Sequence, residues 1–411
     1  MKIFNRKLKI TSSALLTLCM VFVMTACAEN SSQSEKSQPA EQTTVQPTTM
    51  SAEEINDRKL DKFISDMTLE EKVGQMFFVR CPDEDAVQQV SKYNIGGYIL
   101  FGRDFDGKTK DEVVDDIHSY QNEADIPLLI GVDEEGGTVV RVSSNPNLRE
   151  TPFLSPKDTY ADGGWDAVKQ DAEEKADLLL SLGINVNLAP VCDMTSDEYG
   201  FMYDRSFSSD VDMENRYVRT VVETSKSKKL GTVLKHFPGY GNNSDTHTGI
   251  AYDDRDYSEF ENTDFKPFYQ GIESGADCIL VSHNIVNCMD SEYPASLSQK
   301  VHDILRNEFK FDGVIMTDDL IMDAITDFTG DEAAAVTAAK CGNDLLCCSS
   351  VDTQYPAVLE AVQNGEIPEA QVDASVKRIL KWKQNLGIFN IDTYQKKVKS
   401  TEPTDTVGSE E

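Results

Sequence analysis

The sequence predicts an α/β fold, a (β/α)8 barrel of the TIM type that forms a single catalytic domain. The first observation is that short apolar runs alternate with amphipathic helical stretches from residue 51 onward. The second is that eight such runs are present and are continuously apolar, as strands covered on both faces require. The third is that no G-x-G-x-x-G run follows any of them, which disfavours the alternative, a doubly wound nucleotide-binding sheet.

The predicted strands are six to ten residues long, and most of them end in polar or charged residues. They are Val73–Arg80, Gly96–Gly102, Pro127–Asp133, Ile184–Asp193, Leu230–Phe237, Cys278–Asn284, Gly313–Asp319 and Asp344–Ser349. Thr68 and Glu71 have the spacing of a capping box at the start of a helix. The longer predicted helices are Ile55–Met67, Thr109–Glu123, Trp165–Ser181, Met213–Lys228, Asp264–Ser274, Ser298–Glu308, Asp331–Cys341 and Glu369–Leu386.

Composition and charge exclude several classes of protein. The chain has 411 residues, of which 39 are Lys or Arg and 71 are Asp or Glu, so its formal net charge is −32. An apolar fraction of 39% excludes wholesale disorder. The acidic balance excludes a nucleic-acid partner, because phosphate neutralisation needs a basic surface. The seven cysteines after Cys27 are odd in number and lack zinc or redox spacing, so we expect no disulfide framework and no metal site. We also expect no cofactor.

The N-terminal segment has the features of a bacterial lipoprotein signal. A basic start is followed by an apolar run over Ala14–Met24 and by two small residues before Cys27. We expect removal of residues 1–26 and lipidation of Cys27, the alternative being an ordinary secreted protein that is cleaved nearby. Residues 27–54 are rich in Ser, Gln, Thr, Glu and Pro, which predicts a disordered tether. The barrel would span residues 55–390, followed by a charged tail at 391–411, on the outer face of the cell membrane.

Charged and polar side chains gather where the predicted strands end. In such a barrel the active site lies at the C-terminal ends of the strands. Any one of these residues could be a solvated charge on the rim, but the convergence of all of them indicates a catalytic site. They are Arg103, Asp104, Asp133, Asp193, Lys235, His236, His283, Asp318 and Asp319.

One long run makes a family resemblance specific. Residues 235–247, KHFPGYGNNSDTH, resemble the K-H-F-P-G-H-G…D-S-H pattern of glycoside hydrolase family 3, in its β-N-acetylglucosaminidase branch. The resemblance extends over about residues 55–390, because further segments match in the same order. They are MTLEEKVGQM (67–76), DEEGGTVVR (133–141), NLAPVCD (187–193), DRSF (204–207), SH (282–283), PASLS (294–298) and TDDL (317–320).

This resemblance implies a retaining hydrolase that releases terminal β-linked N-acetylglucosamine, typically from cell-wall muropeptides. It implies that Asp318 is the nucleophile, which forms a covalent glycosyl-enzyme. Asp319 is the alternative, and alternation along the strand is expected to turn only one of the two toward the sugar. The implied acid/base is His247, oriented by Asp245, on a mobile loop. The glycines at 239 and 241 are expected to let that loop swing.

The same resemblance assigns the sugar-binding residues, which are Asp133, Arg141, Arg205, Lys235 and His236. Charged groups of this kind discriminate between sugars, because a missing hydroxyl leaves a buried charge without a partner. Asp193 and His283 are weaker candidates, which are expected to brace the residues that touch the sugar.

The chain departs from the family pattern in the catalytic loop. Tyr240 stands where the pattern has His, Thr246 stands where it has Ser, and the interval from Lys235 to the Asp-x-His pair is one residue shorter. We predict hydrolysis, but a histidine acid/base would not repel phosphate, so phosphorolysis stays open. A β-glucosidase of the same family and a lipid-anchored sugar-binding protein without turnover also stay open.

Overall fold

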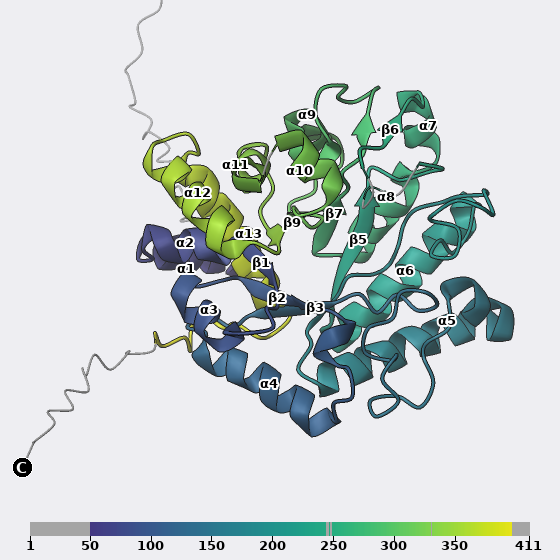
Figure 1. The fold of residues 1–411 in the computed structure, drawn as a ribbon, viewed down its shortest axis with the longest axis horizontal. Helices are drawn as coiled ribbons and strands as arrows, with labels where there is room; N and C mark the ends of the chain where they lie inside the picture. The colour runs from purple at the N-terminus through teal and green to yellow at the C-terminus, as the bar shows by residue number, and fades with distance from the viewer. Residues whose placement is uncertain (1–49, 244–245, 247–248, 330, 397–411) are drawn as a thin grey trace, which may run out of the picture. The chain divides into compact units, whose positions relative to one another are not determined.

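Eight parallel strands form the centre of the computed structural model, which describes residues 50–243, 246, 249–329 and 331–396. Their order is β10-β1-β2-β3-β4-β5-β7-β9, and a parallel bridge between Met316 and Leu345 joins the two ends of that order. The sheet therefore closes, and the predicted barrel is confirmed (Figure 1). The strands are β1 Phe77–Arg80, β2 Gly97–Leu100, β3 Leu129–Val132, β4 Val186–Asn187, β5 Gly231–Phe237, β7 Cys278–Val281, β9 Val314–Thr317 and β10 Leu346–Cys348.

Helices surround the strands (Figure 1), and the sequence predicts most of the long ones to within a few residues. The sequence does not predict α3, α7, α10 or α12, and α12 contains Pro356, a residue that usually ends a helix. The short strands β6 Tyr252–Asp253 and β8 Ile285–Val286 pair separately from the barrel. The helices are α1 Ala52–Ser65, α2 Leu69–Gln75, α3 Ala86–Tyr93, α4 Lys110–Glu123, α5 Pro156–Ser181, α6 Val211–Lys228, α7 Tyr257–Asn262, α8 Phe265–Ser274, α9 Gln299–Asp303 with a π-helical continuation over Ile304–Glu308, α10 Asp323–Thr329, α11 Asp331–Lys340, α12 Val351–Gln363 and α13 Glu369–Asn385.

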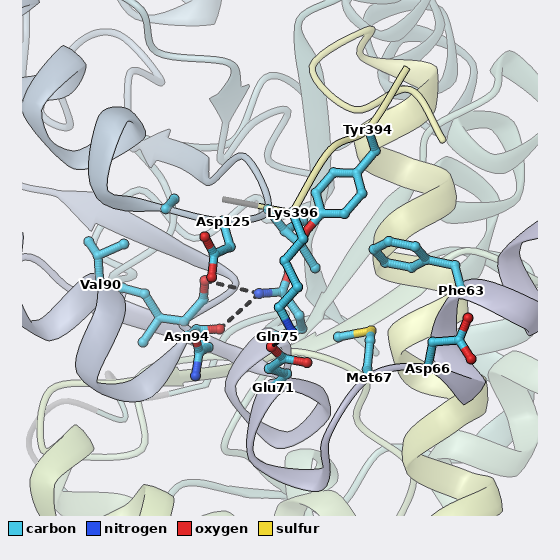
Figure 2. Close-up of a pocket in the computed structure, with 13 residues that line it drawn as sticks. Phe63, Asp66, Met67, Glu71, Gln75, Val90, Asn94, Asp125, Tyr394 and Lys396 are labelled. Carbon is cyan, nitrogen blue, oxygen red and sulfur yellow. Dashed lines mark hydrogen bonds and ion pairs between the residues drawn. The ribbon is translucent and has the colours of Figure 1, made fainter. Parts of the chain in front are cut away.

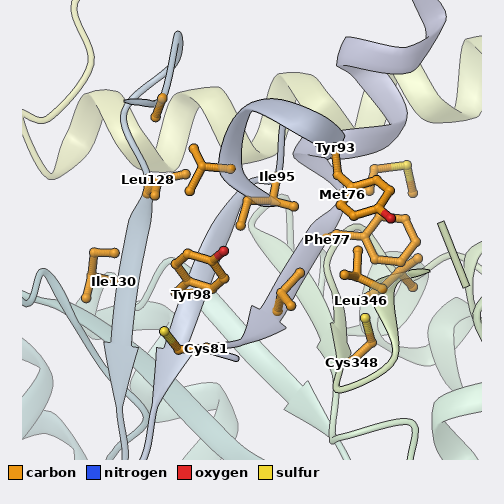
Figure 3. Packing of buried hydrophobic residues seen from close by; sticks show 14 of the residues in the cluster. Met76, Phe77, Cys81, Tyr93, Ile95, Tyr98, Leu128, Ile130, Leu346 and Cys348 are labelled. Atoms are coloured by element: carbon orange, nitrogen blue, oxygen red, sulfur yellow. The ribbon is translucent and has the colours of Figure 1, made fainter. Parts of the chain in front are cut away.

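Alternate residues of each strand face two different cores. Figure 3 shows Phe77, Tyr98, Ile130 and Leu346, which come from four neighbouring strands and pack between the barrel and its helices. The helices cover the outer face of the strands, which would face solvent in an uncovered sheet. The residues on that face are therefore apolar as well.

The inner core fills the barrel itself. Phe78 of β1 belongs to this core, and one glycine on each of the next two strands, β2 and β3, makes room for its ring. A Cβ at Gly97 would lie 2.8 Å from Cδ2 of Phe78, and a Cβ at Gly131 would lie 2.5 Å from its Cζ. Trp382 of α13 belongs to the same core and lies against Gly231, the first residue of β5. The last helix therefore covers the N-terminal ends of the strands.

The described domain begins earlier and extends further than the sequence predicts. Ser51 caps α1 by accepting a hydrogen bond from the backbone N–H of Glu54 at 3.1 Å, so the domain begins ahead of residue 55. After α13, the ring of Tyr394 packs edge-on against Phe63 with centroids 4.9 Å apart. Residues 391–396 thus pack on the domain instead of starting a free tail. The predicted signal at 1–26, Cys27, the tether up to residue 49 and residues 397–411 lie outside the described residues.

The cysteines of the described region form no cross-links. All seven of them are free, and six are buried while Cys288 is exposed. In the same part of the chain, no helix combines the length and the apolarity needed to cross a membrane.

A cavity of about 220 Å³ lies beside α1, α2 and α3, at the segment that follows α13 (Figure 2). The side chain of Gln75 borders it and donates from Nε2 to the carbonyl oxygens of Asn94 at 2.8 Å and Ile95 at 3.3 Å. Its Oε1 accepts a hydrogen bond from Nζ of Lys383 at 2.8 Å. Lys383 is fully buried, and no carboxylate among the described residues pairs with it.

Replacing Lys383 with methionine is expected to stabilise the protein at low pH. Burial lowers the pKa of Lys383 to about 7, from its usual value of 10.5 in the unfolded chain. Between these values the unfolded chain binds the additional proton, so wild-type stability rises with pH across this range. We expect Lys383→Met to raise the free energy of unfolding by about 2 kcal/mol at about pH 6, and the difference to shrink by about pH 9.

Chemical denaturation at both pH values measures this effect. Lys381→Met is the matched control, since Lys381 lies on the same helix but pairs with Asp57 at 2.6 Å near the surface. The control variant should change stability by less than about 1 kcal/mol at either pH. A stability difference for Lys383→Met that does not vary with pH would contradict the prediction.

Candidate active site

A cavity of about 670 Å³ opens at the C-terminal ends of the barrel strands. It collects side chains that are far apart in the sequence, because all eight parallel strands point the same way. All five sugar-binding residues predicted from the sequence line this cavity, and so do Asp318 and Asp319. The polar and charged lining residues are Arg80, Asp133, Glu135, Thr138, Arg141, Asp204, Arg205, Lys235, His236, Tyr240, Asp318 and Asp319.

Lys235 stands at the centre of a buried charge network. Its Nζ lies 2.6 Å from Oδ1 of Asp133 and 2.6 Å from Oε1 of Glu135. Glu135 in turn accepts two hydrogen bonds from Arg205, at 2.9 Å from Nε and at 2.7 Å from Nη2. Two cations thus share one carboxylate that is 3% exposed. The bidentate pair with Glu135 fixes Arg205, and the two ion pairs fix Lys235, before any ligand arrives.

The network keeps its members charged. Burial by itself would raise the pKa of Glu135, but the charges of Arg205 and Lys235 outweigh it and hold that pKa well below its usual value. Burial would likewise lower the pKa of Lys235, but the carboxylates of Asp133 and Glu135 raise it. The cavity therefore offers both a fixed ammonium and fixed carboxylates to sugar hydroxyls.

Asp193 lies behind His236, as expected of a bracing residue. Its Oδ2 is 2.7 Å from Nδ1 of His236, and it also accepts from the backbone N–H of His236 at 3.0 Å. On the far side of the ring, Nε2 of His236 lies 3.2 Å from Nη2 of Arg205. Asp193 is fully buried and fixes the orientation of the imidazole that lines the cavity.

Asp318 and Asp319 both line the cavity. They follow β9, which ends at Thr317, and the expectation that only one of them faces the sugar stays a prediction. Asp319 accepts from Ser349 Oγ at 2.7 Å and from the backbone N–H of Ile321 at 3.2 Å. Burial raises the pKa of Asp319 above its usual value, and these two hydrogen bonds offset that rise only in part.

His283 supports the turn that carries the two aspartates. Its Nε2 is 3.0 Å from the carbonyl oxygen of Asp319, and its Nδ1 is 2.7 Å from Oγ of Ser296. His283 is fully buried, and it is absent from the cavity wall. It therefore holds the backbone of Asp319, in line with the bracing role expected from the sequence.

The predicted acid/base pair, Asp245 and His247, lies outside the described residues. The glycines ahead of it lie close to neighbouring side chains. A Cβ at Gly239 would lie 2.3 Å from Oδ1 of Asp264, and a Cβ at Gly241 would lie 2.7 Å from Cζ of Arg255. Both glycines also have positive φ. They are thus needed for close packing at this bend.

Sequence reasoning missed several residues of the cavity wall, among them Arg80, Phe101 and Glu135. Glu135 lies within the matched DEEGG segment, so a charged residue two positions after Asp133 was the available signal. Arg80 ends β1, and its guanidinium carbon lies 4.3 Å from the ring centroid of Phe101. The rim candidate Arg103 instead pairs with Asp83 at 2.8 Å and lies outside this cavity.

The loop that carries Arg141 is held by the nearby residue Glu134. This buried carboxylate accepts from the backbone N–H of Arg141 at 2.9 Å and from that of Val142 at 2.7 Å. Arg141 is thereby placed at the cavity, with its guanidinium carbon 5.9 Å from the ring centroid of Phe101. In the part of the chain that the structure describes, no group of three or more His, Cys, Asp or Glu is placed to hold a metal ion.

Comparison with known families assigns the chain. Residues 68–382 match the model described as the glycosyl hydrolase family 3 N terminal domain. The chain belongs to glycosyl hydrolase family 3. The family 3 chain is 32% identical over 273 residues to a beta-hexosaminidase of Nitrosomonas eutropha, a match that covers 64% of this chain and 77% of that protein. It is 31% identical over 327 residues to the beta-hexosaminidase LpqI of Mycobacterium tuberculosis, covering 75% and 81% of the two chains.

Solved structures of family 3 enzymes share the fold. A family 3 beta-N-acetylglucosaminidase from a Paenibacillus species has a TM-score of 0.74 and 29% identity, and the match covers 84% of this chain and 66% of that one. The M. tuberculosis LpqI structure has a TM-score of 0.71 and 26% identity, with coverage of 79% and 96%. The family and the glycosidase class predicted from the sequence are thereby confirmed.

Proposed function

We propose that this family 3 glycosidase hydrolyses terminal β-linked N-acetylglucosaminides with retention of configuration. The observation that carries the proposal is the placement of Asp318 in the same cavity as the buried network of Asp133, Glu135, Arg205 and Lys235. The names of the relatives, which are beta-hexosaminidases and a beta-N-acetylglucosaminidase, support the choice of sugar.

In the proposed mechanism, the carboxylate of Asp318 attacks the anomeric carbon. The bond from that carbon to the leaving oxygen breaks, and the imidazolium of His247 gives its proton to that oxygen. A water molecule then attacks the anomeric carbon of the glycosyl-enzyme and gives a proton to His247. The bond to Asp318 breaks, which releases N-acetylglucosamine and restores the carboxylate. Asp245 orients the imidazole of His247 and stabilises its charged form.

The charge network has the chemistry to select the sugar. Lys235 and Arg205 donate, and Asp133 accepts, in directions that are fixed by Glu135. His236 lines the same cavity, and Asp193 orients its imidazole. Arg141 completes the set of groups that we assign to the hydroxyls and the N-acetyl group. A sugar that lacks one of these groups leaves a buried donor or acceptor without a hydrogen-bond partner, so discrimination is expected to be strong.

The proposed place of action is the outer face of the cell membrane. The lipoprotein signal and Cys27, together with the Ser- and Thr-rich tether, support a lipid anchor. A membrane-anchored hydrolase of this specificity would meet cell-wall glycans, so muropeptides are the proposed natural substrates.

Turnover of an aryl β-N-acetylglucosaminide in phosphate buffer tests the proposal. We expect N-acetylglucosamine as the main product, and the β-anomer as the first anomer seen by NMR. An N-acetylglucosamine phosphate as the main product would instead establish phosphorolysis. Faster turnover of the matching aryl β-glucoside would establish a β-glucosidase, and a protein that binds N-acetylglucosamine without turning over either glycoside would be a binding protein.

A further inference from the structure

Tyr240 connects the sugar-binding part of the cavity to the catalytic loop. Its hydroxyl is hydrogen-bonded to Oγ1 of Thr246, and both residues are buried, with Tyr240 1% exposed and Thr246 0% exposed. We propose that Tyr240 is a positioning residue, which anchors Thr246 and through it supports the acid/base step that is assigned to the two sequence neighbours of Thr246. This inference rests on the proposed function and deepens it.

Tyr240 is itself held firmly at both its backbone and its ring. Its backbone N–H donates to Oδ1 of Asp193 at 2.7 Å, on the same carboxylate that orients His236. Its ring meets the ring of His236 edge-on, with centroids 5.2 Å apart, and that of Phe201 at 5.9 Å. The phenol therefore has a fixed place relative to the sugar-binding groups, and its hydroxyl is a fixed point for the loop.

The backbone on either side of Tyr240 is fixed as well. Nη2 of Arg255 donates to the carbonyl oxygen of Gly239 at 3.2 Å, and the same guanidinium packs against Gly241. Arg255 is held in turn by Asp253 at 2.8 Å and by Asp264 at 3.0 Å. The segment from β5 to Gly241 is thus a rigid base from which the phenol reaches Thr246.

Thr246 is covalently linked to both members of the predicted acid/base pair, since it lies between Asp245 and His247 in the sequence. Proton transfer needs heavy atoms about 3 Å apart, so an anchor one residue away from the imidazole restricts where that imidazole can lie.

The expected consequence concerns protonation of the leaving group alone. A phenyl glycoside needs a proton on its leaving oxygen, whereas a dinitrophenyl glycoside leaves readily as the anion. The value of kcat/KM reports the first bond-breaking step for both substrates. A misplaced acid should therefore lower kcat/KM for the phenyl substrate and leave that for the dinitrophenyl substrate almost unchanged.

The experiment compares Tyr240→Phe and Thr246→Val on phenyl and dinitrophenyl β-N-acetylglucosaminides. Each variant removes one side of the same hydrogen bond and retains most of the side-chain volume. We expect each to lower kcat/KM for the phenyl substrate by about ten-fold, to change that for the dinitrophenyl substrate by less than about two-fold, and to leave the inhibition constant of N-acetylglucosamine unchanged. The double variant should lower kcat/KM for the phenyl substrate by no more than either single variant does. Thr246→Ser keeps the hydroxyl and should retain the wild-type kcat/KM on both substrates.

Tyr98→Phe is the matched control, because the hydroxyl of this fully buried tyrosine donates to the carbonyl oxygen of Ala86 at 2.7 Å, away from the cavity. It should leave both kcat/KM values unchanged. Equal losses on the two substrates, or no loss in Tyr240→Phe, would overturn the inference while wild-type hydrolysis left the proposed function standing. A wild type that hydrolyses neither glycoside would overturn both.

Discussion

Asp318→Asn is expected to lower kcat for an aryl β-N-acetylglucosaminide by about a thousand-fold or more, because an amide cannot form the glycosyl ester. Asp318 follows the end of β9 in the cavity wall, whereas Asp133 and Glu135 are committed to Lys235. The substitution keeps the shape of the side chain, so the thermal unfolding midpoint should stay close to that of the wild type. Steady-state rates and a thermal melt on the same preparation measure both effects.

Asp319→Asn is the matched control for this substitution. Asp319 lines the same cavity, but its carboxylate is occupied by Ser349 and the backbone of Ile321. We expect Asp319→Asn to reduce kcat by less than about a hundred-fold. A further variant, Asp318→Gly, should regain turnover of the dinitrophenyl substrate when azide is added, with the α-glycosyl azide as product. Wild-type rates in Asp318→Asn, or azide rescue in Asp319→Gly instead, would show that the nucleophile is misassigned.

Glu135→Gln is expected to lower the free energy of unfolding by about 3 to 5 kcal/mol, because it leaves Lys235 and Arg205 as buried cations with too few carboxylates. Lys235 would retain Asp133, whereas Arg205 would lose the negative charge of Glu135 and one of the two hydrogen bonds that it donates to it. The rate of glycoside hydrolysis should fall as well, because Lys235 and Arg205 are both proposed to bind the sugar. Urea denaturation monitored by circular dichroism measures the stability change.

The pH dependence of this loss follows from the lowered pKa of Glu135. A carboxyl group whose pKa is lower in the folded protein contributes its stability above the unfolded-state value of 4.5, and loses it as the pH falls through the lower folded-state value. The difference between wild type and Glu135→Gln should therefore be constant from about pH 6 to about pH 8. Glu174→Gln, at a surface pair with Arg149, is the control and should cost less than about 1 kcal/mol. A similar cost in both variants would refute the proposed role of the buried network.

The barrel could be predicted from the sequence because its strands carry their signal locally. A run such as CILV at β7 is apolar at every position, and only a strand covered on both faces needs that. Helix α12 is harder to predict, because Pro356 lies inside it, although the flanking Tyr355 and Val358 are buried and stabilise it through packing. Tertiary contacts thus outweigh the local preference of the proline.

The candidate site could be predicted in part for a similar reason. Asp133, Lys235 and His236 follow or end strands, so their positions along the chain already bring them to one end of the barrel. The role of Glu135 depends on Arg205, which lies 70 residues away in a loop, and no local pattern encodes that pairing. The contact of Tyr240 with Thr246 is likewise a property of the folded loop.

The pairing of the first strand with the last has a consequence for how the chain folds. Phe77 of β1 pairs with Leu346 of β10, and Trp382 then covers the N-terminal ends of the strands. Closing such long-range contacts is slow, and none of them can form until the C-terminal part of the chain is available. A chain that is threaded through a membrane from its N-terminus would therefore complete its barrel only after α13 has crossed. Folding would then be coupled to the end of export.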